Sequence, residues 1–187
     1  MTEVWLQSNR RVLGMALVPA AALVAVGLGL AAAVEAAPWK VVGWALAGLG
    51  GLLVLGLANQ WRQPRIAYRD GQVLFNLRAG RPVAVPAEAV EAFFLGQGPA
   101  YLPRTHGPDA EAVNLVARLS QKTPEWMHVP VKPALGHWCD GYVTIRGTWC
   151  ERLTNDVIRR LNARLRQLRD ERKAAEAAAS SSSEPAP

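Results

Sequence analysis

Hydrophobic positions are distributed unevenly along this chain of 187 residues. The first third holds two long apolar runs, whereas the remainder alternates between apolar and polar positions over short stretches. The first run, residues 12–34, has 23 uncharged positions, and the second, residues 41–58, has 18. At about 1.5 Å of helix rise per residue, the first exceeds the hydrocarbon thickness of a bilayer and the second approaches it. The pattern predicts two membrane-spanning helices.

The segment between the two runs, residues 35–40, leaves room only for a tight turn. Residues 1–61 are therefore expected to form a transmembrane hairpin inserted in the lipid bilayer. Three tryptophans fall where interfacial aromatic anchors belong, namely Trp39, Trp44 and Trp61.

Positive charge flanks the outer ends of the hairpin and is scarce at its turn, which has only Lys40. Arg10 and Arg11 precede the first run, and the second run is followed by Arg62, Arg65 and Arg69. By the positive-inside rule, this charge predicts a multi-pass protein of the cell (inner) membrane with both termini in the cytoplasm. The last three arginines are also candidates for contact with the membrane surface.

The apolar runs have three other interpretations. The first run resembles a secretory signal with a cleavage site near residues 34–36, but it is longer than a signal core. The pair Arg10-Arg11 faintly resembles a twin-arginine signal, although Gly14 stands where a bulky residue is preferred. Two core helices of a soluble protein would need more covering chain than the remaining 126 residues supply.

Small residues recur at four-residue spacing in the second run, at Gly43, Ala47 and Gly51. Such spacing lets two helix backbones approach closely. The favoured interpretation is packing on the first run of the same hairpin, through Gly27 and Ala31. The alternative is a homo-oligomer formed through this face.

From residue 62 the pattern predicts an antiparallel β structure of seven short strands. Asp70-Gly71 supplies a strong hairpin signal, and Ala79-Gly80 a second turn. A loop is expected over residues 96–109. The strands are expected over residues 65–69, 72–78, 81–85, 90–95, 112–119, 126–131 and 142–145.

An amphipathic helix is predicted to follow, starting from a capping box at Thr148 and Glu151. Its apolar stripe consists of Leu153, Val157, Leu161, Leu165 and Leu168. The fold class is thus α+β: a two-helix transmembrane hairpin, then a small antiparallel β-barrel or sandwich capped by a C-terminal amphipathic helix. Residues 62–173 form the cytoplasmic domain, and residues 174–187 are expected to be a disordered Ala/Ser/Pro tail.

Three stretches carry a family resemblance, at residues 64–71, 83–86 and 91–96. With seven strands, a final helix and a preceding helix pair, they resemble bacterial membrane-associated pleckstrin-homology-like proteins. The resemblance implies a bent barrel capped by a helix, and a binding or scaffolding role that is not enzymatic. The connection at Asp70-Gly71 is too short for a basic phosphoinositide-binding loop.

Candidate chemistry is sparse. The cluster from His137 to Asp140 includes Cys139 and is followed by Cys150, but it lacks the four paired ligands of structural zinc. No metal, cofactor or catalytic residue is therefore expected. The alternative is a membrane-anchored enzyme or thiol-dependent sensor that uses His137 and Cys139.

Charge bears on the partners of the cytoplasmic domain, because residues 62–173 hold 18 Lys and Arg against 11 Asp and Glu. A basic line on the predicted helix (Arg152, Arg159, Arg166 and Lys173) lacks interleaved aromatics, which disfavours nucleic acid. The leading hypothesis is an interaction or scaffold domain at the membrane, with a protein partner or an anionic lipid headgroup as ligand. A subunit of a larger membrane complex is the remaining alternative.

Overall fold

The computed structural model describes residues 2–78, 80–99 and 111–182. Within those ranges the fold is of the α+β class, as predicted. The chain divides into two compact units, and Gln7–Pro64 forms one of them, a pair of long helices. The other unit, here called the sheet domain, contains the residues on both sides of that pair. The predicted division after residue 61 is therefore wrong for the first six residues, which belong to the sheet domain.

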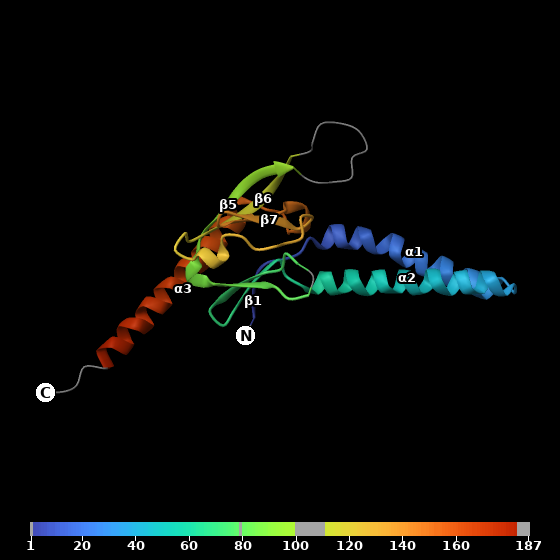
Figure 1. The fold of residues 1–187 in the computed structure, drawn as a ribbon, viewed down its shortest axis with the longest axis horizontal. Coiled ribbons are helices and arrows are strands. Elements are labelled where there is room, and N and C mark those ends of the chain that lie inside the picture. Colours follow the sequence, from blue (N-terminus) through green and yellow to red (C-terminus); the bar gives the residue numbers. More distant parts are fainter. Residues whose placement is uncertain (1, 79, 100–110, 183–187) are drawn as a thin grey trace. The chain divides into compact units, whose positions relative to one another are not determined.

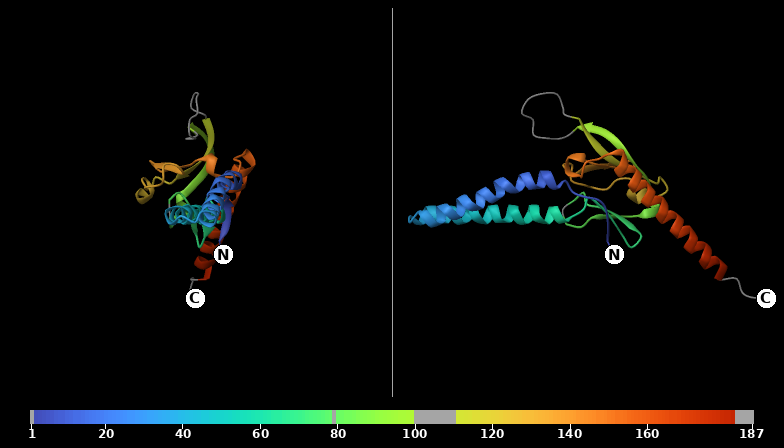
Figure 2. Two further views of the ribbon diagram at one scale, coloured as in Figure 1. Left: turned by 90° about the vertical axis from the view of Figure 1, so that its right-hand side faces the viewer. Right: turned by 180° about the vertical axis from the view of Figure 1, so that it is seen from behind.

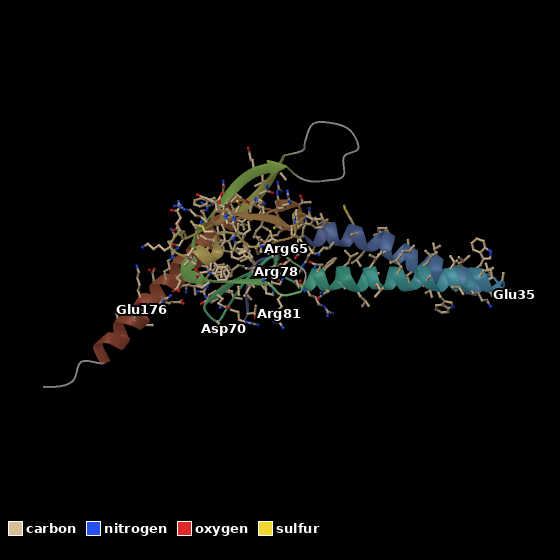
Figure 3. The ribbon with its side chains drawn as sticks, in the orientation of Figure 1. Glu35, Arg65, Asp70, Arg78, Arg81 and Glu176 are labelled. Carbon is tan, nitrogen blue, oxygen red and sulfur yellow. The ribbon has the colours of Figure 1, made fainter. Side chains whose placement is uncertain are left out.

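The helix pair consists of α1 (Arg10–Ala33) and α2 (Ala37–Arg62), which run antiparallel side by side (Figure 1). The side chain of Asn9 accepts hydrogen bonds from the first turn of α1 and so caps it. Pro38 occupies the first turn of α2, where the missing N–H of proline costs nothing. Figure 3 shows Glu35 at the turn that joins the two helices. These boundaries agree with the two predicted apolar runs.

The first sheet of the sheet domain has four antiparallel strands in the order β1-β2-β3-β4. Its first strand, which the sequence analysis missed, precedes the helix pair and pairs with β2, which follows the pair. The backbone N–H of Arg65 continues this pairing by donating to the carbonyl of Leu6 at 2.8 Å. The strands are β1 (Glu3–Leu6), β2 (Ile66–Arg69), β3 (Gln72–Phe75) and β4 (Val83–Pro86).

The second sheet is also four-stranded and antiparallel, in the order β5-β6-β8-β7. Within each sheet an Asp-Gly turn closes a tight hairpin. Asp70 and Gly71 have φ of 51° and 80°, and Asp140 and Gly141 have 52° and 74°, the left-handed values that such turns require. The strands are β5 (Val90–Pro99), β6 (Glu111–Leu119), β7 (Gly136–Cys139) and β8 (Tyr142–Ile145).

Several predicted boundaries change. The strand expected over residues 126–131 is wrong, because a 3-10 helix, η2 (Pro124–Trp126), stands there and no strand follows before β7. Pro130 and Pro133 remove backbone donors from that segment. The loop expected from residue 96 begins later, since β5 continues to Pro99. Ala79 and residues 100–110 lie outside the described residues.

One apolar core joins the two sheets. Phe75 from β3 meets Trp138 from β7 edge-to-face, with ring centroids 5.6 Å apart. Phe93 and Leu115, both fully buried, extend the core through β5 and β6. Within the described residues the two sheets do not close into a barrel. The predicted barrel or sandwich is thus a pair of four-stranded sheets around one core.

The last helix, α3 (Asn155–Ser182), covers this core with Leu161 and Leu165. It begins after the predicted cap, because Thr148 lies in a 3-10 helix, η3 (Gly147–Trp149). The hydroxyl of Thr154 accepts from the third residue of α3 instead. The helix continues to Ser182 and extends beyond the sheets (Figure 2). The disordered tail predicted from residue 174 is therefore wrong for residues 174–182, which are helical.

Side chains of α3 also bind the free edges of both sheets. The amide of Asn162 accepts from the N–H of Phe93 at 2.9 Å and donates to its carbonyl at 2.8 Å, as a neighbouring strand would. On the first sheet, Arg164 makes a bidentate ion pair with Glu3, at 2.9 Å for both nitrogens. The helix therefore connects the edge strand β1 to the edge strand β5.

We expect Asn162→Ala to destabilise the sheet domain by about 1–3 kcal/mol, because both backbone groups of Phe93 lose their partner. Thermal unfolding in detergent micelles measures the loss, and hydrogen exchange should become faster at the Phe93 amide. Arg166→Ala, one turn away on the exposed face, is the matched control and should change stability by about 0.5 kcal/mol or less. Unchanged exchange at Phe93 would contradict the edge-binding role.

Candidate functional site

The helix pair is the first candidate site, because both helices are long and apolar enough to cross a membrane. Only 17% and 11% of their most apolar windows are buried. Large side chains such as Met15, Leu52 and Leu55 are exposed by 68–76%. Within the described residues the two helices are thus not the buried core of a soluble fold.

The predicted anchors lie near the two ends of α2. Trp39 and Trp44 are near its start, exposed by 56% and 64%, and Trp61 is near its end. Trp39 and Trp61 are separated by 22 positions, which at about 1.5 Å each matches the thickness of a bilayer core. Trp61 packs over Gly14 of α1, 3.6 Å from where a Cβ would stand. This spacing is compatible with the predicted interfacial anchors.

Small residues hold α1 and α2 together, as favoured from the sequence. A Cβ added at Gly27 would lie 2.4 Å from the backbone nitrogen of Ala47, and one at Gly43 would lie 2.6 Å from that of Ala31. The packing predicted for Gly51 is wrong, because Gly51 faces open space and Gly50 lies against Val24 instead. At about 100° per residue, a position seven after Gly43 returns to the same face, whereas one eight after it has drifted by about 80°.

The three arginines predicted to contact the membrane surface lie in different surroundings. Arg62 ends α2 and is exposed, as is Arg69 at the end of β2, where it pairs with Asp70. Arg65 is only 2% exposed, so its assignment as a surface contact is wrong. Its guanidinium donates to the carbonyls of Trp149 and Asn76, and burial lowers its pKa. Arg65 therefore stabilises the interior of the sheet domain.

A groove of about 370 Å³ lies between α3 and the turn that joins β2 to β3. Its apolar lining includes Tyr68, which stacks on Trp5 with ring centroids 5.5 Å apart. Its rim carries both signs of charge. The residues that line it are Tyr68, Gly71, Ala87, Glu88, Leu165, Leu168, Arg169, Glu171 and Arg172.

The charged groups at this groove are already engaged within the protein. Arg172 pairs with Glu88 and, at 2.8 Å, with Glu176. Arg169 donates to the carbonyls of Val90 and Glu91. A phosphate entering the groove would have to displace these partners and approach two carboxylates. The groove is better suited to an apolar side chain than to an anionic headgroup.

The cysteine and histidine candidates separate in the structure. Cys150 is 1% exposed, its thiol donates to the carbonyl of Arg146, and burial raises its pKa to about 12. Cys139 is half-buried, and its hydrogen bond with Asp140 raises its pKa. A reactive cysteine needs a lowered pKa, so neither thiol is activated as a nucleophile.

The histidine that joins Cys139 is not the one suggested by the sequence. His137 is exposed on β7, whereas His128, which follows η2, reaches the β7–β8 turn. Its Nε2 lies 3.4 Å from the Asp140 carboxylate. His128, Cys139 and Asp140 each offer a donor atom within 4.8 Å of the other two. Asp140-Gly141, the same dipeptide as Asp70-Gly71, is the sequence signal for this hairpin, and no predicted turn included it.

Comparisons with family models, curated proteins and solved structures give no match to this chain. The resemblance to pleckstrin-homology-like proteins therefore stays a prediction.

We expect Gly27→Ala and Gly43→Ala to destabilise the helix pair by about 1–3 kcal/mol, because each new methyl group would meet backbone atoms of the other helix. The same change at Gly29 and Gly51, which face open space, should leave stability unchanged or slightly raised. The midpoint of unfolding by SDS in mixed micelles, followed by tryptophan fluorescence, compares the four variants. Equal effects at all four positions would contradict this packing.

Proposed function

We propose that this chain is an integral protein of the cell membrane that holds its sheet domain at the cytoplasmic face as a non-enzymatic interaction module. The observation that carries the proposal is the pairing of β1 with β2 on either side of the helix pair. Three residues connect β1 to α1, and three connect α2 to β2. Each connection spans about 10 Å at most. Two short connections would keep the domain at the membrane surface.

Charge supports the orientation. Arg10, Arg11 and Arg62 lie at the end of the helix pair from which both connections leave, and Glu35 and Lys40 lie near its turn. By the positive-inside rule, this charge supports a cytoplasmic location for the sheet domain and both termini. Cleavage of the first helix as a signal would remove β1 and leave β2 without its partner strand, which disfavours secretion.

The groove beside α3 supports a protein partner over a lipid headgroup. Tyr68, Leu165 and Leu168 offer an apolar surface, and the nearby arginines are paired within the domain. An extended segment with a large apolar side chain suits these contacts. Arg62 and Arg69 are exposed, and each would attract an anionic leaflet by about 1 kcal/mol, less for Arg69 because it pairs with Asp70, as a separate orienting effect.

Three further assignments bear on this proposal. The two sheets around one core and the covering helix are compatible with a pleckstrin-homology-like domain. The thiol-dependent alternative is less well supported, because the hydrogen bond that raises the Cys139 pKa works against a nucleophile there. An accessory role in a membrane complex would use the same groove.

We expect the chain to remain in the membrane pellet after carbonate washing. In a Cys139→Ser background, where buried Cys150 does not react, Glu35→Cys should react with an impermeant maleimide in intact cells. Arg69→Cys should react only after permeabilisation. Both positions are exposed, so accessibility within the protein is matched. Release by carbonate would contradict integral insertion, and the reverse labelling pattern would contradict the orientation.

A photoreactive phenylalanine analogue at Leu168, in the groove, should form an adduct with a protein partner in native membranes. The same analogue at exposed Arg166 is the matched control on α3 and should form none. Ala87→Arg, which places a charge in the groove, should abolish the Leu168 adduct. Equal adducts at both positions, or adducts with lipid alone, would contradict recognition of a protein by this groove.

A further inference from the structure

The β7–β8 turn gathers three different metal-binding side chains that the proposed function does not use. Cys139 ends β7, Asp140 occupies the turn, and His128 reaches them from the segment after η2. Their imidazole nitrogen, thiol sulfur and carboxylate oxygen lie within 4.8 Å of one another. One nitrogen, one sulfur and one oxygen is a donor set typical of zinc.

We propose that His128, Cys139 and Asp140 bind a Zn²⁺ ion. In a tetrahedral site, ligand bonds of about 2.0 Å to nitrogen and to oxygen place those two atoms about 3.3 Å apart. The observed distance from His128 Nε2 to Asp140 Oδ1 is 3.4 Å. Binding forms a zinc–sulfur bond, and the thiol proton leaves to solvent. The His128–Asp140 pair thus already has the separation that a shared ion requires.

The two segments that supply these ligands are fastened to each other beside the site. The indole Nε1 of Trp138 donates to the carbonyl of Trp126 at 2.7 Å. The N–H of Gly141 donates to the carbonyl of Met127 at 3.3 Å. Trp138, Met127 and Gly141 are the chain neighbours of the three ligands. The two hydrogen bonds therefore hold the ligands near one another before the ion binds, which lowers the entropic cost of binding.

The site is open to solvent, so water can reach the fourth coordination position of the ion. The side chains of His128 and Asp140 are 65% and 79% exposed. A water molecule would therefore complete four-coordinate zinc. The ion would crosslink the β7–β8 hairpin to the segment between η2 and β7, which has no strand and no α-helix. Zinc should consequently raise the melting temperature of the whole chain.

The test uses the full-length protein in detergent micelles, stripped of metal with a chelator and titrated with Co²⁺ as a spectroscopic probe. We expect a thiolate-to-cobalt charge-transfer band, and we expect Zn²⁺ to displace the cobalt with one ion per chain. Cys139→Ser should abolish the band. Loss of a residue that only contacts a metal ligand typically weakens metal binding 10–100-fold. His128 and Asp140 are proposed as ligands themselves, so His128→Gln and Asp140→Asn should each weaken Zn²⁺ binding at least 10-fold.

Asp140→Asn is suited to this purpose because asparagine also tolerates the left-handed backbone at this position. His137→Gln, two residues from Cys139, and Cys150→Ala, in the core, are the controls and should leave Zn²⁺ affinity unchanged. Circular dichroism checks that each variant is folded. The proposal is overturned if the band is absent, if it survives Cys139→Ser, or if His137→Gln weakens binding as much as His128→Gln.

Discussion

The pairing of β1 with β2 is the constraint on which the rest of the structure depends. The helix pair is inserted between two neighbouring strands, so the first sheet is complete only when both ends of the pair return to it. Trp5 and Leu6 of β1 are 4% and 0% exposed, and they contribute to the core as fully as residues of the later strands. The ion pair between Glu3 and Arg164 then joins this edge to α3. The helix pair is therefore connected to the sheet domain through two paired strands of one sheet.

Features with a local cause were predictable from the sequence. Both long helices follow from uninterrupted apolar runs, and the β2–β3 hairpin follows from Asp70-Gly71, whose left-handed backbone selects that dipeptide. The contacts of Gly27 and Gly43 follow from the need of two backbones to approach closely. Buried Leu161 and Leu165 follow from helical periodicity. In each case a few neighbouring residues contain the whole physical reason.

Features that depend on distant pairing were not predictable. The four residues of β1 carry no turn signal of their own. They form a strand only because they pair with β2, which lies beyond the entire helix pair in the sequence. Arg65 lies close in sequence to α2, which predicts a membrane-surface position, but its side chain turns inward to the carbonyl of Trp149. His128 and Cys139 are brought together by a hairpin and a proline-containing segment, so their separation in sequence gave no ligand spacing to recognise. Asp140-Gly141 marks the turn in the sequence, but the approach of His128 to that turn has no sequence signal.

The separation of the paired strands β1 and β2 along the chain also implies an order of assembly. Bringing together two points 55 positions apart, as Ser8 and Gln63 are, costs about 3.5 kcal/mol of loop-closure entropy in a flexible chain. Formation of the antiparallel helix pair removes most of that cost, because it places the two residues within a hydrogen bond of 2.5 Å. Leu6 and Arg65 then stand only two positions further along the chain on either side. Packing of α1 on α2 therefore favours addition of β1 to the sheet, so the helix pair forms before the first sheet is complete.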